Sequence, residues 1–306
     1  SRSAPGLKTL EDALDIRRRV LTAFEDAERQ PDADEQRRLL TFLIVGGGPT
    51  GVELAGSLAE IAHHTLAHEF RRIDPASAKV ILVEGGPTIL SAYPESLRVA
   101  ARGSLHRLGV DVREGAVVTG IESGLVRMKE ETLRVGTVLW AAGVAASSLG
   151  ASLGVPLDKA GRVVVRPDLS IPGYPGVFVI GDLASFTHSG GKPLPGVAPV
   201  AQQQGKHAAE NIRRAVRGKS PEPFHYKDWG SLATIGRGSA IADFGRVRLS
   251  GYVAWLAWLF IHVMRLVGFR NRAAVFFEWA WAYVTYQRSV RLITAVRDEE
   301  ASGQAR

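Results

Sequence analysis

The sequence of 306 residues predicts an α/β protein, and three of its features carry this prediction. A short apolar run rich in β-branched residues leads directly into a glycine-rich loop and then into a helical pattern. A second apolar run ends in a Gly-Asp pair, and another helical pattern follows it. Two aromatic, amphipathic runs come last. At roughly 100–200 residues per domain, a chain of this length forms about two domains.

The composition excludes several classes of site. The chain has no cysteine, which rules out disulfides, thiolate metal sites, thiolate-held iron–sulfur clusters and cysteine-based redox relays. Glycine, at 33 of 306 residues, exceeds its usual share of ~7% and indicates tight turns and close backbone approaches. The net charge of +7 favours an anionic partner such as a nucleotide, a nucleic acid or an acidic membrane surface.

Residues 1–38 are expected to form a linking segment with an amphipathic helix. The helical pattern begins at Thr9, which can form a capping box with Asp12, and extends to about Glu28. Apolar residues recur on one side of it at helical spacing, namely Ala13, Ile16, Val20, Phe24 and Ala27. The opposite side is charged, so we expect it to be solvated and predict no function for it.

The next segment predicts a nucleotide-binding loop. A strand buried on both faces is expected at Thr41–Val45, and residues 46–51 (Gly-Gly-Gly-Pro-Thr-Gly) join it to a helix. In such a loop Gly46 permits the tight turn, Gly48 leaves room for a pyrophosphate, and Gly51 lets the helix pack closely on the strand. The phosphates would bind the free N–H groups of the helix N-terminus. A glycine-rich turn of another α/β protein is the alternative.

An acidic residue ends the following strand, which is expected at Lys79–Val83. The carboxylate of Glu84 can accept hydrogen bonds from both ribose hydroxyls of an adenosine and repels a 2′-phosphate, which favours NAD(H) over NADP(H). Glu84 lies 38 positions after Gly46, whereas about 20 is usual. The segment 63–78 must therefore hold additional helix or loop.

Further elements complete this first unit. A helix is expected at Pro94–Leu108, ended by Gly109. Short strands are expected near residues 111–112, 117–121 and 137–140, and the last leads to Ala142 and Gly143.

A second nucleotide-binding motif lacks a glycine loop. The run 176–180 predicts a buried strand that ends in Gly181-Asp182, where an aspartate can hydrogen-bond a polyol or ribose hydroxyl. An ordinary turn aspartate is the alternative. A helix follows from about Ala198, with Pro199 in its first turn. Its free N–H groups would stabilise an anion such as the N1–C2=O edge of a reduced flavin.

The order of these motifs resembles that of the two-dinucleotide-binding flavoproteins and, within them, the type II NADH dehydrogenases (NADH:quinone oxidoreductases). The motifs that carry the resemblance are Gly46–Glu53, Leu139–Val144, Val179–Asp182 and Ala198–Gly205. The resemblance implies the cofactors FAD and NADH, and a reaction in which a hydride passes from NADH to FAD and electrons pass to a membrane quinone without proton pumping.

The resemblance also implies a domain plan. A Rossmann-like NADH-binding domain (39–146) would be inserted in a partial FAD-binding domain (147–228), with a C-terminal amphipathic helical membrane anchor in residues 229–306. Family members open with an FAD-binding strand and glycine loop ahead of the segment that matches Ala4. The sequence has no counterpart of these, so we expect a fragment of the full enzyme without the half-site for the ADP moiety of FAD.

The resemblance implies roles for individual residues. Glu53 would lie between the nicotinamide and the flavin as a catalytic residue, although a solvated acid in the first helical turn is equally open. Gln203 is the second expected catalytic residue, because it matches a quinone-proximal motif in which Pro199 replaces the first glutamine; an ordinary surface amide is its alternative. The histidines His63, His64 and His207 are interpreted as structural. The expected cofactor-binding residues are Gly46, Gly48, Gly51, Glu84, Ala142, Gly143, Gly181, Asp182 and Ala198.

The C-terminal region predicts membrane association. Its two apolar runs, 252–269 and 273–284, contain four of the six tryptophans, and neither reaches the ~20 uncharged residues of a membrane-spanning helix. Nine arginines and two acids lie between Trp229 and Arg297. This pattern favours helices that lie on an anionic membrane surface. We therefore expect a peripheral protein on the cytoplasmic side of the cell inner membrane. A buried hairpin, a homodimer interface and a re-entrant or spanning segment are alternatives. Nucleic-acid binding is not expected, because no nucleic-acid-binding module is present.

Two other functions stay open. A ferredoxin- or rubredoxin-reductase-like NADH flavoprotein would share both nucleotide-binding motifs, but the arginine- and tryptophan-rich C-terminal region argues against it. An NADH-binding membrane module without catalysis is the non-enzymatic alternative.

Overall fold

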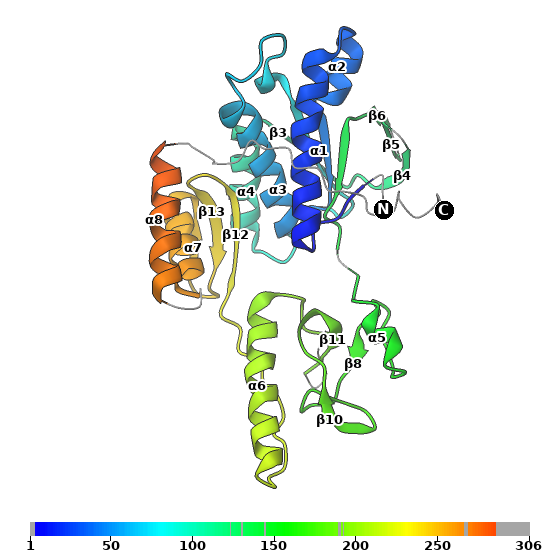
Figure 1. The fold of residues 1–306 in the computed structure, drawn as a ribbon, viewed down its shortest axis with the longest axis vertical. Coiled ribbons are helices and arrows are strands. Elements are labelled where there is room, and N and C mark those ends of the chain that lie inside the picture. Colours follow the sequence, from blue (N-terminus) through cyan, green and yellow to red (C-terminus); the bar gives the residue numbers. More distant parts are fainter. Residues whose placement is uncertain are drawn as a thin grey trace, which may run out of the picture. The chain divides into compact units, whose positions relative to one another are not determined.

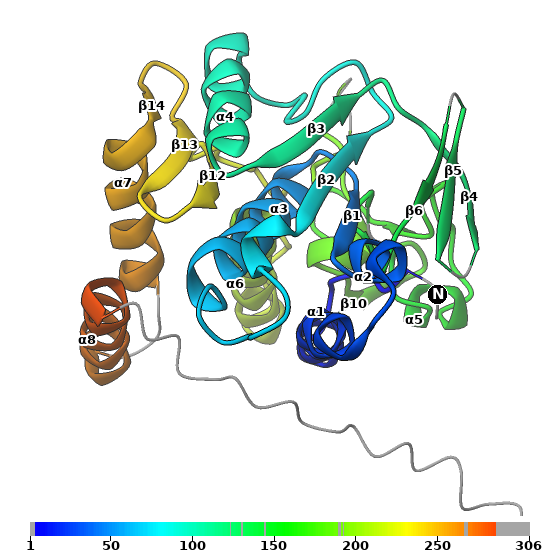
Figure 2. The ribbon, with the colours of Figure 1, turned by 90° about the horizontal axis from the view of Figure 1, so that it is seen from above.

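The computed structural model describes residues 4–122, 124–129, 131–143, 145–188, 191, 193–265 and 269–285. The chain divides into two compact units. Unit 1 comprises residues 1–143 and 230–306, and unit 2 comprises residues 144–229. Figures 1 and 2 show the helices and strands of each unit.

A four-stranded parallel sheet forms the centre of unit 1. Its strands are, in chain order, β1 (Thr41–Val45), β2 (Lys79–Glu84), β3 (Val110–Glu114) and β7 (Thr137–Trp140). The spatial order β3-β2-β1-β7 places β1 between two neighbours. All five residues of β1 are buried, as the sequence predicts for this strand. The carboxyl end of β1 therefore opens at the middle of the sheet edge, where α/β proteins bind ligands.

Helices cover one face of this sheet. They are α1 (Leu10–Arg29), α3 (Pro49–Glu60) and α4 (Glu95–Arg107), whereas α2 (Ala33–Leu39), which has no buried residue, joins α1 to β1. Both hydrogen bonds of the predicted capping box between Thr9 and Asp12 are present. The apolar face of α1 packs on the sheet, where Phe24 stacks on Phe42 with ring centroids 5.4 Å apart. Gly109 follows α4 with a φ of +80°, as a helix-ending glycine requires.

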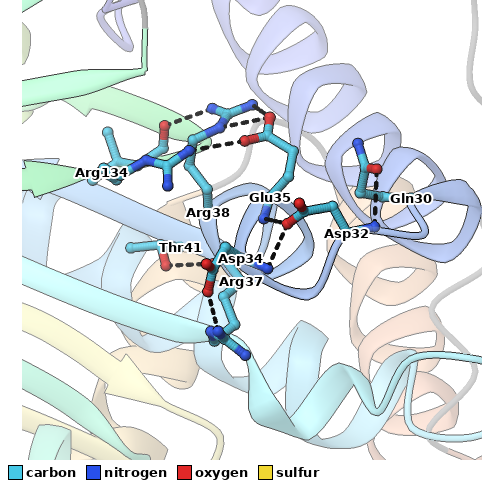
Figure 3. A network of polar contacts seen from close by, with 9 residues as sticks. Gln30, Asp32, Asp34, Glu35, Arg37, Arg38, Thr41 and Arg134 are labelled. Atoms are coloured by element: carbon cyan, nitrogen blue, oxygen red, sulfur yellow. Dashed lines mark hydrogen bonds and ion pairs between the residues drawn. The ribbon is translucent and has the colours of Figure 1, made fainter.

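The linking segment contains a second helix, α2, which the sequence analysis did not predict. Asp32 caps it by accepting the N–H groups of Asp34 and Glu35. Figure 3 shows how polar contacts fasten this helix: Arg38 donates to the carbonyl of Val135 at 2.9 Å, and Arg134 donates to Glu35 at 3.2 Å. Helix α2 is thus tied to the strand region just before β7.

A small antiparallel sheet covers the other face of the parallel sheet (Figure 2). Its strands are β4 (Val118–Glu122), β5 (Leu125–Met128) and β6 (Thr132–Arg134). Val126 and Val138 pack with Leu43 in the cluster between the two sheets. The sequence analysis predicted the first of these strands and not the other two.

The long spacing between Gly46 and Glu84 has a structural explanation. The chain forms a π-helix, η1 (Ile61–Thr65), and a 3₁₀ turn, η2 (Pro75–Ser77), before it enters β2. Glu28 holds the intervening loop to α1 by accepting the N–H groups of residues 71–73 at 3.0–3.2 Å. Extra helix and loop therefore occupy the segment where the sequence analysis expected them.

The C-terminal part of unit 1 corrects an expectation, because it contains a sheet as well as helices. The elements are β12 (Ser231–Gly236), β13 (Ser239–Asp243), β14 (Arg248–Ser250), α7 (Gly251–Arg265) and α8 (Phe269–Thr285). The antiparallel sheet packs on α3 and α4 with one face and on α7 with the other (Figure 2). Small residues at Ala240 and Ala242, buried against Ala254 of α7, allow this packing. Their small side chains gave no strong strand pattern in the sequence.

Unit 2 is built from short elements around helix α6. These elements are α5 (Leu149–Ser152), β8 (Val163–Val164), β9 (Ser170–Ile171), β10 (Tyr174–Phe178), η3 (Gly181–Leu183), β11 (Ala184–Ser185) and α6 (Ala198–Val216). The sequence analysis expected a buried strand at residues 176–180. Instead β10 ends at Phe178 and its first four residues are exposed. Within the described residues it pairs irregularly with the two-residue strand β9, which is too short to cover it.

Candidate functional site

The three motif glycines of the loop after β1 have three different surroundings. Gly46 has a φ of +113°, and a Cβ atom on it would lie 2.5 Å from the backbone nitrogen of Ala142. A Cβ atom on Gly51 would lie 1.8 Å from the carbonyl oxygen of Gly46. At Gly48, by contrast, no atom of the described residues lies within 4 Å of the corresponding point. The loop therefore requires glycine for its own geometry at two positions and leaves an open space at the third.

That open space lies at the N-terminus of α3. Gly48 is the N-cap residue and provides no side-chain hydrogen bond to the first turn, and Pro49 and Thr50 are exposed. The uncapped N–H groups and the positive end of the helix dipole face solvent there and suit a phosphate. The residues present thus fit a dinucleotide pyrophosphate.

Glu84, at the end of β2, holds this loop in place. Its Oε2 accepts the N–H of Gly47 at 2.6 Å, and its Oε1 accepts the N–H of Gly86 at 2.6 Å. The N–H of Leu90 donates to the carbonyl oxygen of Gly47 at 2.7 Å. An ionised carboxylate offers about four acceptor positions, so Glu84 retains capacity for ribose hydroxyls. The sequence predicts a ligand contact for Glu84 and gives no sign of this contact with the loop.

Ala142 and Gly143 lie across the loop from Glu84, since β7 and β2 flank β1 on opposite sides. Both residues are exposed, and Gly143 has a φ of +100° with no atom among the described residues within 4 Å of its Cβ position. Val144, which belongs to the same motif, lies outside the described residues. At this edge of the sheet, β2 therefore ends in the carboxylate of Glu84, and β7 is followed by the exposed backbone of Ala142 and Gly143.

Glu53 lies in the second turn of α3, half-buried against the C-terminal sheet. Its Oε1 accepts the backbone N–H of Thr234 at 3.2 Å. Burial raises the pKa of the Glu53 carboxyl, while the hydrogen bonds from Thr234 and the nearby imidazole of His262 oppose that rise. A solvated acid in the first helical turn does not describe this environment. Thr234 is a contact that sequence reasoning missed, because β12 was not predicted.

In unit 2, the Gly-Asp turn lies beside the start of α6. Gly181 has a φ of +66°, and Asp182 is exposed. A Cβ atom on Gly196 would lie 3.1 Å from Oδ1 of Asp182, so that glycine gives the carboxylate its space. Ala198 begins α6, and Val197 provides no side-chain cap. An exposed acceptor and an uncapped helix N-terminus fit a polar, partly anionic cofactor such as FAD.

Gln204 is a further residue of this site that sequence reasoning missed. It is buried, and its Oε1 accepts the N–H of Gly181 at 2.7 Å. This bond fastens the Gly-Asp turn to α6. The signal in the sequence was the run of three glutamines at 202–204, from which only Gln203 was selected.

Gln203 and His207 have backbone partners within unit 2. Gln203 donates from its amide nitrogen to the carbonyl of Lys227 at 2.9 Å and accepts the N–H of Lys227 at 3.0 Å. His207 contacts the carbonyl oxygen of Glu222 at 2.8 Å, which agrees with its interpretation as structural. In the part of the chain that the structure describes, no cluster of His, Cys, Asp and Glu suits a metal ion.

The candidate residues thus fall into two groups. Unit 1 brings together the glycine loop, Glu84 and the Ala142-Gly143 end of β7, with Glu53 one turn further along α3. Unit 2 brings together Gly181, Asp182 and Ala198.

Comparisons with known families and relatives identify proteins that this chain resembles. Residues 3–205 match the pyridine nucleotide-disulphide oxidoreductase family, and residues 229–288 match the NDH2 C-terminal domain. A type II NADH:quinone oxidoreductase of Mycobacterium tuberculosis is 43% identical and covers 99% of this chain. An internal alternative NAD(P)H-ubiquinone oxidoreductase of Arabidopsis thaliana mitochondria is 32% identical and covers 91% of this chain.

The chain spans 66% of the mycobacterial relative and 58% of the plant relative. Among solved structures, NDH2 from Plasmodium falciparum in complex with NADH superposes with a TM-score of 0.83 at 18% identity, covering 96% of this chain and 75% of that one. At that identity the likeness concerns the fold.

Proposed function

The chain belongs to the pyridine nucleotide-disulphide oxidoreductase family and, within it, to the type II NADH:quinone oxidoreductases, and on this premise we propose that it takes part in passing a hydride from NADH to FAD and electrons to a membrane quinone. The observation that carries the proposal is the loop after β1. Gly46 and Gly51 are required by the backbone, whereas at Gly48 no atom of the described part of the chain fills the space beside the backbone. A bound pyrophosphate gives that space a function.

We assign NADH to the carboxyl edge of the parallel sheet. The N–H groups at the start of α3 would bind its phosphates, and the Glu84 carboxylate would accept the hydroxyls of the adenosine ribose. Ala142 and Gly143 would border the rest of the dinucleotide, because they are exposed and have no side chain larger than a methyl group. Glu84 disfavours a 2′-phosphate, so NADH is preferred to NADPH.

We assign FAD to the Asp182 turn and the N-terminus of α6. Asp182 would accept a hydroxyl of the cofactor's polyol chain, and the uncapped start of α6 at Ala198 would stabilise negative charge. When bound, FAD supplies the two-electron chemistry that connects NADH to the quinone. Gln204 keeps the Asp182 turn against α6 through its bond to Gly181.

We further propose roles for Glu53 and Gln203. Glu53 is a half-buried acid whose pKa is raised by burial, which suits a group that holds or moves a proton during hydride transfer or quinone reduction. Gln203 would act on the quinone side by fixing the Lys227 backbone beside α6, since both atoms of its amide are engaged there.

The two C-terminal helices support association with a membrane surface. Phe260 of α7 and Phe277 and Trp281 of α8 are 66%, 70% and 66% exposed. Trp258 and Trp279 stack with ring centroids 5.6 Å apart, which joins α7 to α8. Arg270 is also exposed and suits an anionic headgroup. Among the described helices none combines the length and the apolar character needed to cross a bilayer.

From these observations we propose a peripheral location on the cytoplasmic side of the cell inner membrane, with an anionic lipid surface as partner. A homodimer through the same aromatic surface is the competing arrangement. Residues 266–268 and 286–306 of the expected membrane region lie outside the described residues.

The test of this function is a spectroscopic assay. The chain, joined to an N-terminal FAD-binding segment of the kind that family members carry and purified in detergent with added FAD, is expected to oxidise NADH when a soluble quinone is present, and to oxidise NADPH much more slowly. A strong preference for NADPH would contradict the role of Glu84. NADH binding without quinone-dependent turnover would favour a binding module, and turnover with ferredoxin instead of quinone would favour a reductase of that class.

A further inference from the structure

One face of α3 is a docking surface for strand β12. Glu53, Gly56 and Glu60 lie three and four residues apart, so they share this face. At Gly56 a Cβ atom would lie 1.6 Å from the carbonyl oxygen of Ile235. No side chain fits at that position, and the strand backbone rests directly on the helix backbone. The position of β12 along α3 is therefore closely defined.

Glu60 fastens the turn that follows β12. It is 7% exposed, and its Oε1 accepts the backbone N–H of Arg237. Ser104 of α4 and Ser239 of β13 add a hydroxyl–hydroxyl hydrogen bond at 3.0 Å. These contacts hold the hairpin between β12 and β13 against two helices and leave Thr234 little freedom to move relative to α3.

Thr234 acts on the carboxylate of Glu53 from two positions. Its backbone nitrogen donates a hydrogen bond to Oε1 at 3.2 Å, and its hydroxyl lowers the pKa of the Glu53 carboxyl. Hydrogen bonds to an ionised carboxylate are stronger than those between neutral groups and favour the charged form. The partner that stabilises this acid thus comes from the C-terminal sheet, 181 residues further along the chain.

Two other titratable groups face Glu53 from the elements packed around it. Tyr93, in the turn before α4, is buried, and burial together with the charges of Glu53 and Asp243 raises its pKa to about 12, so the phenol stays neutral. His262 of α7 adds a favourable charge when protonated. Its ring is held by a 2.8 Å contact between Nδ1 and the carbonyl of Trp258.

We propose that Thr234 is a positioning residue, which orients the Glu53 carboxylate and stabilises its ionised form through the hydroxyl and the backbone N–H of β12. The C-terminal sheet then has a second task beyond carrying α7 and α8: it completes the surroundings of an acid on the dinucleotide-binding helix. The catalytic part of this inference rests on the role proposed above for Glu53.

The test compares two substitutions that differ by the hydroxyl alone. Thr234→Val removes the hydroxyl and keeps the shape, whereas Thr234→Ser keeps it. The pKa of Glu53 is measured by carbon-13 NMR of the glutamate carboxyls of the full chain during a pH titration, with Glu53→Gln to assign the signal. Thr234→Val is expected to raise the pKa of Glu53, since the contribution of the hydroxyl that lowers this pKa is lost. Thr234→Ser is expected to leave the pKa near that of the unmodified protein.

If the pKa of Glu53 is the same in both variants and in the unmodified protein, the proposal is overturned. Thermal unfolding of each variant shows whether it is folded. If Thr234→Val fails to fold, Thr234→Ala, which removes the hydroxyl without placing a new methyl group near the carboxylate, takes its place and the same shift is expected.

A kinetic measurement separates this inference from the proposed function. The pH profile of NADH oxidation with quinone is expected to shift to higher pH in Thr234→Val and to lose this ionisation in Glu53→Gln. If Glu53→Gln leaves both the rate and the profile unchanged, the catalytic role of Glu53 fails, even where the NMR shift shows that Thr234 sets its ionisation. If Glu53→Gln alters the profile and Thr234→Val does not, the positioning role of Thr234 fails.

Discussion

The carbonyl oxygen of Gly46 lies 1.8 Å from the point that a Cβ atom on Gly51 would occupy. The first turn of α3 therefore lies directly on the end of β1, and the contact tolerates no side chain. Because Gly46 also packs against the backbone of Ala141 and Ala142, this one contact ties together β1, α3 and β7. The geometry of the whole candidate NADH site depends on it.

A matched pair of substitutions separates folding from binding at this loop. Gly51→Ala is expected to destabilise the protein by about 3 kcal/mol or more, since the added methyl group overlaps the Gly46 carbonyl. Gly48→Ala is expected to leave the melting temperature almost unchanged, because its φ is −71° and no atom of the residues that the structure describes lies within 4 Å of the Cβ position. It is nevertheless expected to weaken NADH binding at least tenfold. Thermal unfolding and NADH fluorescence titration measure the two effects; full NADH affinity in folded Gly48→Ala would exclude the pyrophosphate from this position.

Glu84 is expected to control both the affinity for NADH and the choice of dinucleotide. In Glu84 each carboxylate oxygen accepts one backbone N–H, from Gly47 or from Gly86. Glu84→Gln removes the negative charge and replaces one of these two acceptor oxygens by an amide nitrogen. We expect NADH to bind about tenfold more weakly and the preference over NADPH to shrink, since charged hydrogen bonds contribute roughly 1.5–3 kcal/mol. Titration with each dinucleotide measures this. Glu122→Gln, an exposed acid of β4 paired with Arg127, is the control and should change neither value. An unchanged NADPH preference in Glu84→Gln would refute the selective role.

The contact between Gly56 and Ile235 predicts how the C-terminal sheet is attached. Gly56→Ala places a methyl group 1.6 Å from the Ile235 carbonyl, which must push β12 away from α3. The expected cost is about 1–3 kcal/mol. The neighbouring Ser57 is exposed, so Ser57→Ala should be neutral. Hydrogen exchange of residues 231–243 is expected to accelerate in Gly56→Ala and not in Ser57→Ala; equal protection in both variants would show that the contact does not fasten the sheet.

The raised pKa of Glu53 predicts how the stability of the folded protein depends on pH. Burial raises it above the ordinary value of 4.5, so the folded protein binds this proton more tightly than the unfolded chain. The corresponding stability is complete below the ordinary pKa and is lost as pH rises through the raised pKa.

Glu53→Gln removes this ionisation. The melting temperature of the variant minus that of the unmodified protein is therefore expected to increase with pH between about pH 4 and the raised pKa, and to level off above it. Taking the difference cancels the other carboxyls. A difference that stays constant across the range, or falls, would contradict a raised pKa.

The aromatic surface of α7 and α8 predicts binding to lipid. Replacing Phe260, Phe277 and Trp281 together by serine is expected to reduce co-sedimentation with anionic vesicles severalfold without lowering the melting temperature, since all three side chains are largely exposed. Leu10→Ser, at a 71% exposed position on α1, is the control. Light scattering without lipid tests the competing arrangement: a dimer that dissociates in the triple variant would identify the surface as a subunit interface.

The sequence by itself determined the features whose causes are local. The β1 strand, the capping box of α1 and the stop at Gly109 could be predicted because each depends on neighbouring residues. The roles of three glycines could also be predicted, namely the tight turn at Gly46, the open space at Gly48 and the close approach at Gly51. All three depend on the conformation of a single loop. The family, too, followed from the order of such local motifs.

Only the tertiary structure decided which residues surround Glu53 and what Glu84 and Gln203 bind. The β12–β14 sheet could not be predicted from the sequence. Its alanines and glycines allow close packing on helices, but residues this small give only a weak strand pattern. Thr234 could not be connected to Glu53 from the sequence, since the two are 181 residues apart. A carboxylate accepts hydrogen bonds from the donors that lie near it in the folded protein. Which donors these are depends on how the helices and sheets pack.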